Sequence, residues 1–211
     1  MRLSKQKDQR FWDRIAPKYA RDPVRDEAAY AHKLALTQAH LHPGMSLLEL
    51  GCGTGSTALA HAPHVASIDA VDVSDAMLEI ARAKAAELTI ENLTFRKGDV
   101  DTVEAALSGY DAVLALSLLH LLPDRRGALA RMARWLKPGG LLVTNTPCLG
   151  DSMAFIKPIL PIGRWLGRFP YVEVFRQETL AEDFSAAGFV LVEQWQPQRA
   201  NPYFAIHRRP A

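Results

Sequence analysis

The 211-residue chain contains little of what marks several large classes of protein. Its two cysteines, Cys52 and Cys148, are too few for a disulfide framework or a cysteine-based zinc site, and we expect no metal site. No apolar run reaches the roughly 18 residues that a membrane span needs, and the first residues are too polar for a signal peptide. These absences predict a soluble protein of the reducing cytoplasm, without a transmembrane segment.

An excess of positive charge is missing as well. Lys and Arg total 25 against 23 Asp and Glu, which gives a net charge of +2, and no basic block resembles a nucleic-acid footprint. We therefore expect no nucleic-acid partner. Hydrophobic residues make up 48% of the chain, which is enough for a sizeable core, and no internal repeat or low-complexity segment is visible. The length fits a single domain.

Short apolar segments alternate with amphipathic ones from residue 43 onward. Strands with continuously apolar cores, separated by helices, are typical of βαβ units and a parallel sheet. We therefore expect an α/β fold with a doubly wound, Rossmann-like sheet of seven mostly parallel strands, helices on both faces and an antiparallel C-terminal hairpin. The predicted strands are 46–50, 65–73, 93–100, 110–119, 141–147, 190–195 and 203–209. The predicted helices between them are 56–62, with Thr54 or Ser56 as N-cap, 75–88, 125–136, stopped by Pro138-Gly139-Gly140, and 177–189.

The same pattern divides the single domain, 1–211, into four regions. A helical cap (1–42) precedes the core (43–147), and a C-terminal helix and β-hairpin (177–211) end the chain. Between them lies an insertion (148–176) in which Lys157, Arg164 and Arg168 stand between apolar and aromatic residues. We expect the insertion to lie on the substrate side, although packing on the sheet, a dimer contact or contact with a membrane surface would explain its composition too.

Three glycines follow the first predicted strand, in the sequence ELGCGTGS of residues 49–56. Ligands of open α/β sheets bind at the carboxyl ends of the strands, where glycines let the backbone approach them closely. A dinucleotide fingerprint, G-x-G-x-x-G, would place its last glycine at Ser56, one residue beyond Gly55. Glu49 would also repel a pyrophosphate. The loop therefore favours a ligand that carries a cationic group and a carboxylate but no phosphate.

These segments resemble, in order, the motifs of the class I S-adenosylmethionine-dependent methyltransferases. The glycine loop resembles their motif I, and the branch that it most resembles contains small-molecule enzymes of the ubiquinone/menaquinone C-methyltransferase type. The later motifs are AVDVSDAMLEIAR (70–82), FRKGDV (95–100), YDAVLALSLLHLLPD (110–124) and LKPGGLLVTNTP (136–147), and FWDRIAPKYA (11–20) resembles an N-terminal segment of such enzymes. The resemblance implies S-adenosylmethionine as cofactor.

The resemblance also implies roles for particular residues. Asp72 would accept hydrogen bonds from the ribose hydroxyls, Asp99 would accept one from the adenine amino group, and the Val100 amide would meet a ring nitrogen. An aromatic side chain near Tyr19 would cap the cofactor. The full set of implied cofactor-binding residues is Tyr19, Glu49, Gly51, Cys52, Gly53, Gly55, Asp72, Val73, Met77, Asp99, Val100 and Leu116.

His120 is the single candidate for a catalytic side chain. A neutral imidazole can deprotonate a hydroxyl or enol, although a lone histidine beside an apolar strand is commonly structural. Residues 117–120 stand where enzymes that methylate DNA adenine or glutamine often carry an Asn/Asp-Pro-Pro-aromatic motif, and their sequence, SLLH, counts against those substrates. Cys52 reads as a small residue of the glycine loop and not as a nucleophile.

The sequence thus predicts an enzyme that moves a methyl group to a small hydrophobic or amphiphilic acceptor by in-line displacement. The alternative is a non-catalytic protein that binds S-adenosylmethionine as a sensor or partner subunit. A nicotinamide-dependent oxidoreductase is disfavoured by the glycine spacing and by Glu49. The acceptor atom and the oligomeric state stay open at this stage.

Overall fold

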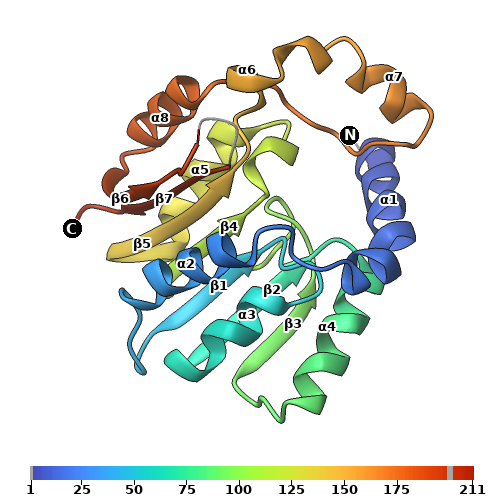
Figure 1. Cartoon of the computed structure of the whole chain (residues 1–211). Helices are drawn as coiled ribbons and strands as arrows, with labels where there is room; N and C mark the ends of the chain where they lie inside the picture. Colours follow the sequence, from blue (N-terminus) through green and yellow to red (C-terminus); the bar gives the residue numbers. More distant parts are fainter. Residues whose placement is uncertain (1, 199–201) are drawn as a thin grey trace.

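The computed structural model describes residues 2–198 and 202–211, and its centre is an open sheet of seven strands (Figure 1). The strand order is β3-β2-β1-β4-β5-β7-β6. Strands β1 to β5 are parallel, whereas β7 runs antiparallel to both neighbours, β5 and β6. The strands are β1 (Ser46–Leu50), β2 (Ser67–Asp72), β3 (Leu93–Lys97), β4 (Tyr110–Leu116), β5 (Leu136–Thr146), β6 (Val190–Trp195) and β7 (Tyr203–Arg208).

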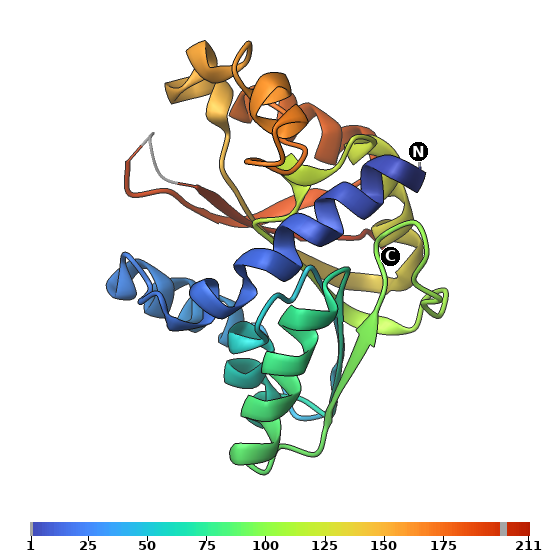
Figure 2. The same ribbon diagram turned by 90° about the vertical axis from the view of Figure 1, so that its right-hand side faces the viewer.

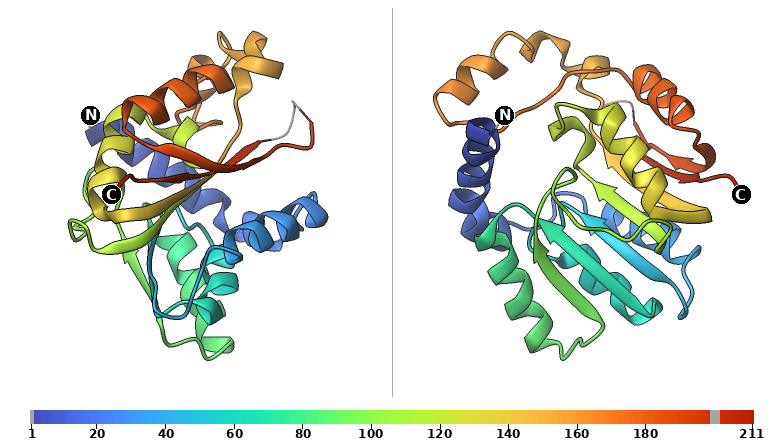
Figure 3. Two further views of the ribbon diagram at one scale, coloured as in Figure 1. Left: turned by 90° about the vertical axis from the view of Figure 1, so that its left-hand side faces the viewer. Right: turned by 180° about the vertical axis from the view of Figure 1, so that it is seen from behind.

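Helices cover both faces of the sheet, as the views in Figures 1 and 3 show. This arrangement confirms the predicted fold class, with the refinement that β7 inserts between β5 and β6, so β6 forms the edge. The helices are α1 (Arg2–Arg21), α2 (Glu27–Gln38), α3 (Ser56–His61), α4 (Asp75–Glu87), α5 (Arg125–Trp135), α6 (Leu149–Ser152), α7 (Leu160–Trp165) and α8 (Gln177–Ala186), with 3-10 turns η1 (Ala62–His64), η2 (Leu119–Leu121) and η3 (Ala154–Ile156).

Alternate residues of the strands feed two apolar cores. On β1, Leu48 and Leu50 pack with Leu129 of α5 and Phe184 of α8, whereas Leu47 joins the core on the opposite face, beneath α3. This alternation is what a strand with both faces buried requires. The chain order reverses between β1 and β4, so the carboxyl ends of these two strands form the switch point at which such sheets bind ligands.

Two predicted local features are wrong. Helix α3 has Gly55 as its N-cap, in the left-handed conformation and without a side-chain cap bond, where Thr54 or Ser56 was expected. The predicted helix 125–136 is observed as α5, one residue shorter, but the predicted start of the fifth strand at 141 is wrong, because Leu136 is already extended and begins β5. By contrast, the predicted Ser74 cap of α4 is confirmed.

The helical cap and the insertion meet at one end of the molecule. Helix α1 runs alongside α4, and the segment from α6 to α7 arches over to the N-terminal part of α1 (Figures 1 and 2). Asp8 of α1 accepts hydrogen bonds from Arg164 Nη2 and the Tyr171 amide, both at 2.9 Å, and Arg14 donates to the Gly167 carbonyl at 2.6 Å. In the described part of the chain, no helix is both long and apolar enough to cross a bilayer.

Candidate active site

The loop between β1 and α3 holds its backbone bare at the carboxyl end of the sheet. Gly51, Gly53 and Gly55 have φ angles of 68°, 53° and 76°, a region that strains residues with side chains. The amides of Gly51 and Cys52 donate to the Val71 carbonyl at 2.7 and 3.0 Å, which fixes the loop against β2. Apart from Gly53 and its two chain neighbours, no heavy atom of the described residues lies within 4 Å of the position that a Cβ on Gly53 would occupy. The backbone at Gly53 is therefore open to a ligand.

The two flanking glycines face protein. A Cβ on Gly51 would lie 3.1 Å from the Leu118 side chain, and one on Gly55 would lie 2.9 Å from Ala81 and 3.2 Å from Phe95. Close packing therefore explains the absence of side chains at these two positions. Contact of Gly51 and Gly55 with the cofactor stays a prediction.

Asp72, the last residue of β2, ties the glycine loop to the start of α4. Its Oδ2 accepts a hydrogen bond from the Gly53 amide at 2.8 Å, and its Oδ1 accepts one from the Ser74 amide at 2.9 Å. Burial raises the pKa of the carboxyl, and these amide donors act against that rise. A carboxylate oxygen accepts more than one hydrogen bond, so Asp72 can still receive a pair of hydroxyl groups.

Glu49 places a buried carboxyl with an unmatched oxygen beside this loop. The residue precedes the last residue of β1 and is 3% exposed, and among the described residues its Oε2 finds no hydrogen-bond partner. Burial, and then the neighbouring charge of Asp72, raises its pKa to about 8. Unmatched buried polar groups are costly and uncommon in proteins. This one is suited to receive a cationic ligand group.

Helix α1 borders the same site. Although 55% of the Tyr19 surface is exposed, partial burial of its phenol and the nearby charge of Asp72, with a smaller contribution from Glu49, raise its pKa. Asp13 precedes Tyr19 on the same helix, and its Oδ1 accepts a hydrogen bond from Ser74 Oγ at 2.6 Å. Sequence reasoning missed Asp13, because its partner on α4 is distant in the chain and no local pattern marks the contact.

The carboxylate of Asp99, in the turn after β3, is already hydrogen-bonded. Lys5 Nζ donates to Oδ2 at 2.7 Å, and Thr102 Oγ1 and the Asp101 amide both donate to Oδ1 at 2.9 Å. Partial burial would raise the pKa of Asp99, but the bonds from Lys5 and Thr102 outweigh it and lower the pKa. Adenine recognition by Asp99 stays a prediction, and it would share the carboxylate with Lys5.

Four further predicted residues have mostly buried side chains. Val100 and Met77 are 6% and 2% exposed, and the Met77 amide donates to the Ser74 hydroxyl at 3.1 Å. Val73 is half-buried between β2 and α4. Cys52 is buried, and that burial raises its thiol pKa far above the ordinary range, which agrees with a packing role. Contact of these residues with the cofactor stays a prediction.

The carboxyl ends of β4 and β5 add a second set of unmatched polar atoms. Leu116 ends β4 and pairs in register with Asn145 of β5. Among the described residues, Asn145 Oδ1, Thr146 Oγ1 and His120 Nδ1 are buried without a hydrogen-bond partner. Burial lowers the pKa of His120 to about 4, so its ring is neutral at pH 7. Sequence reasoning missed Asn145 and Thr146, although two polar residues ending the apolar strand LLVTNT were a usable signal.

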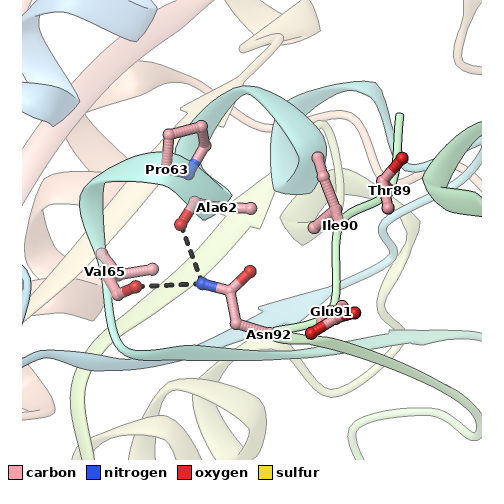
Figure 4. A pocket seen from close by; sticks show the side chains of 7 residues that line it. All are labelled: Ala62, Pro63, Val65, Thr89, Ile90, Glu91 and Asn92. Atoms are coloured by element: carbon pink, nitrogen blue, oxygen red, sulfur yellow. Dashed lines mark hydrogen bonds between the residues drawn. The ribbon is translucent and has the colours of Figure 1, made fainter.

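The described residues line two surface cavities, which differ in size and position. The larger, of about 400 Å³, lies at the amino ends of the strands, and Asn92 Nδ2 spans it by donating to the carbonyls of Ala62 and Val65 at 2.8 and 3.0 Å (Figure 4). The smaller, of about 220 Å³, lies between α5 and the loop that carries Val100 and Asp101. The glycine loop contributes to neither lining.

Comparison with known proteins gives these motifs a family. Residues 47–140 match a family model described as a methyltransferase domain. The chain is 32% identical over 154 residues to an O-methyltransferase of Pyrenophora dematioidea and 31% identical over 141 residues to a ubiquinone biosynthesis O-methyltransferase of Xanthomonas campestris pv. campestris. The matches cover 72% and 65% of this chain but 56% of each relative. The chain therefore spans little more than half the length of these relatives.

Two solved structures share almost the whole fold. The cyclase SpnF has a TM-score of 0.79 at 20% identity, with coverage of 98% of this chain and 96% of its own. A geranyl diphosphate C-methyltransferase of Streptomyces coelicolor A3(2), solved with Mg²⁺, geranyl diphosphate and S-adenosyl-L-homocysteine, has a TM-score of 0.76 at 15% identity, covering 98% of each chain. At these identities the likeness shows the fold alone.

The ordered motifs, the strand order and the curated relatives agree on one class of protein. Residues 47–140 form a methyltransferase domain, and the relatives support the class I S-adenosylmethionine-dependent methyltransferase family that the sequence predicted. S-adenosylmethionine is the cofactor of that family, which confirms the predicted cofactor. The matched methyltransferase domain begins within β1 and ends within β5, so it contains the glycine loop, Asp72, Asp99 and His120.

Proposed function

We propose that this chain transfers the methyl group of S-adenosylmethionine to a small hydrophobic or amphiphilic acceptor. Two neighbouring observations carry the proposal: the backbone at Gly53 is open, and the buried carboxyl of Glu49 has an oxygen, Oε2, without a partner among the described residues. Together they offer a backbone surface and an anionic group at the switch point of the sheet, which suits an amino-acid ligand end. Nothing in this arrangement favours a pyrophosphate.

Roles for the neighbouring residues follow from their positions. Glu49 would receive the ammonium group of the cofactor, Asp72 its ribose hydroxyls, and Tyr19 would cover it from α1. Asp99 and the Val100 amide would recognise the adenine ring at the end of β3. Support for this order comes from the sheet itself, because β1, β2 and β3 are adjacent and parallel, and the Gly98 amide donates to the Asp72 carbonyl at 3.0 Å.

When bound, S-adenosylmethionine supplies a methyl group on a positively charged sulfur, open to in-line displacement by the acceptor. The chain contributes position and environment, and orientation alone can account for several kcal/mol of such a barrier. Asn145 and Leu116 would border the acceptor, since strand register puts both on the same face as Glu49. His120, neutral and unmatched at Nδ1, would accept a proton or hydrogen bond from a hydroxyl acceptor.

The division of the chain into cap, core, insertion and C-terminal region belongs to the same proposal. In it, residues 1–211 act as one methyltransferase domain, 1–42 cover the cofactor, 148–176 border the acceptor, and 177–211 complete the sheet. The hydrogen bonds between Asp13 and Ser74 and between Asp8 and Arg164 support this, since α1 reaches both the core and the insertion. A cytoplasmic location is also proposed, and cell fractionation tests it.

The cofactor half of the proposal is tested by thermal unfolding with S-adenosylmethionine, S-adenosylhomocysteine, NAD and NADP. A ligand at 100 times its Kd adds about 2.7 kcal/mol to the free energy of unfolding. We expect both sulfur-containing ligands to raise Tm and the two dinucleotides to leave it unchanged. A rise with NAD alone would overturn the proposal.

Methyl transfer, the second part of the proposal, needs a separate measurement. The protein is incubated with S-adenosylmethionine labelled in its methyl group and with fractions of a small-molecule extract, and labelled products are sought in the organic phase. We expect label in an apolar fraction. Cofactor binding without labelled product from any fraction would instead favour the sensor or partner protein, the alternative for this fold.

A further inference from the structure

The segment from η3 to Leu166 presents a stripe of large apolar side chains to solvent. Phe155 of η3, Ile159 in the turn that follows, Ile162 of α7 and Leu166 after it are 70%, 54%, 62% and 52% exposed, and Trp165 of α7 is 77% exposed. Of the fourteen large hydrophobic side chains that are exposed in the described residues, seven belong to positions 153–169. A stripe of this kind normally faces a protein core. Single exposed apolar residues are common on protein surfaces, but a group of this size marks a contact surface.

The charge around the stripe has one sign. Lys157, Arg164 and Arg168 belong to the same segment, and no acidic residue occurs between Asp151 and Glu173. Lys157 and Arg168 are exposed, whereas Arg164 is held by Asp8. An apolar face with an aromatic residue and flanking cations, free of carboxylates, matches the surface of an anionic lipid bilayer.

The stripe is held in place by the helix that borders the cofactor site. Gly163 in α7 is buried, and a Cβ there would overlap the Phe169 ring. Arg164 Nη2 donates to Asp8 and its guanidinium lies 5.0 Å from the Tyr171 ring, so α7 is tied to α1 and the apolar side chains are directed outward. The exposure of these side chains therefore accompanies a fixed position of α7 against α1. Figure 2 shows the backbone of this segment above the N-terminal part of α1.

We infer that residues 155–168 dock this protein onto the surface of an anionic membrane, with the Phe155–Leu166 stripe in the headgroup boundary and Lys157 and Arg168 on lipid phosphates. A second copy of the chain fits this surface less well. A two-fold contact would bring the same cations of both copies together without a carboxylate from the segment to neutralise them. Docking would bring α1 and the proposed acceptor site to the bilayer. This purpose of the docking rests on the proposed function.

The test is flotation of the full-length protein with vesicles, without cofactor or acceptor. Vesicles of phosphatidylcholine alone are compared with vesicles that contain equal parts of phosphatidylglycerol, at low and high salt. We expect the anionic vesicles to bind at least tenfold more tightly, since each cation near an anionic surface adds roughly fivefold, and high salt to remove most of this difference. Because no activity is measured, failure of the proposed function would leave the result unaffected.

Variants locate the contact. Trp165→Glu and Ile162→Glu are expected to reduce vesicle binding at least tenfold, whereas Leu107→Glu, at an exposed leucine in the loop before β4, should bind like wild type. Tryptophan emission should shift to the blue on binding, and Trp165→Phe should remove the shift. Equal binding by the Trp165→Glu and Leu107→Glu variants would overturn the inference. The absence of vesicle binding by the wild-type protein would also overturn it. This includes the case in which ultracentrifugation shows dimers that form with rising concentration and depend on Trp165.

Discussion

The amide of Gly53 donates a hydrogen bond to Oδ2 of Asp72 at 2.8 Å, which joins the loop after β1 to the end of β2. The bond restrains an otherwise open glycine and orients a buried carboxylate toward the same space. A loop and an acid that are 19 residues apart in the chain thus form one rigid element before any ligand arrives.

Asp72→Ala is expected to weaken binding of S-adenosylhomocysteine by roughly 100-fold or more, because hydrogen bonds to a charged acceptor contribute about 1.5–3 kcal/mol each. The variant should also lose about 1–3 kcal/mol of stability, since the Gly53 and Ser74 amides lose their partner. Titration calorimetry measures the affinity. Asp75→Ala, at the more exposed neighbouring acid, is the control, and wild-type affinity in Asp72→Ala would mean that the ribose binds elsewhere.

Glu49 should make cofactor affinity depend on pH. Its pKa rises from 4.5 to about 8, so the folded, ligand-free protein holds a proton on this residue at pH 7. Pairing with the ligand ammonium favours the ionised form, so affinity should increase with pH up to about 8 and release a proton. Calorimetry in buffers of different ionisation enthalpy measures this release.

Glu49→Gln is the matched variant for that measurement. It should bind more weakly and show no proton release. The stability of the ligand-free protein depends on pH in the opposite direction. Wild-type stability falls as pH rises from 4.5 toward 8, because the unfolded state gives up the proton that the folded state keeps. The Glu49→Gln variant should not show this fall. Equal proton release by both proteins would contradict a pairing between Glu49 and the ligand.

His61 should make the fold sensitive to acid. It is 1% exposed, neither ring nitrogen has a hydrogen-bond partner among the described residues, and burial lowers its pKa to about 4. Its contribution to stability is complete above the ordinary value of 6.5 and is lost as pH falls toward 4, by up to about 1.4 kcal/mol per pH unit. His61→Leu should flatten this part of the Tm–pH curve, and the exposed His64→Leu should not.

Asn145→Leu is expected to separate stability from function. Replacing a buried amide whose Oδ1 is unmatched should raise stability by about 1 kcal/mol, while methyl transfer falls and S-adenosylhomocysteine affinity is retained. Thr144→Val, at the adjacent buried residue, should do the reverse, because Thr144 Oγ1 donates to the Ala205 carbonyl at 3.3 Å. Its loss costs about 1 kcal/mol and should spare activity. A destabilised Asn145→Leu variant with full activity would exclude an acceptor role.

Asp183 should be the most costly acid to remove. It is 1% exposed, and its Oδ2 accepts a hydrogen bond from Arg125 Nε at 2.7 Å, which joins α8 to α5. Asp183→Ala leaves the buried guanidinium of Arg125 with only the more exposed Glu173 as an ion-pair partner and should cost about 3–5 kcal/mol in urea unfolding. Glu173→Ala, which removes the more exposed partner of the same arginine, should cost about 1 kcal/mol or less. Similar losses in both variants would contradict this reading of the pair.

Much of the fold could be predicted because its signals are local. The strand SLLEL was predicted with its observed bounds, and Ser74 was identified as the cap of α4 because a serine precedes an amphipathic run. The start of β5 was missed, since residues 136–140 pair with β4 only across a register shift that their own sequence does not indicate. The Gly55 cap was missed because packing against Ala81 decides it.

By itself, the sequence determined the class of protein and the methyl donor. The glycine spacing, Glu49 and the order of the later motifs are read along the chain, and short-range rules of strand, loop and helix connect them. Only the tertiary structure decided that Glu49 Oε2 and Asn145 Oδ1 find no hydrogen-bond partner among the described residues, that Lys5 holds Asp99, and that the side chains from Phe155 to Leu166 are exposed. Burial and pairing depend on which distant side chains arrive at a position, and that is a property of the packed molecule.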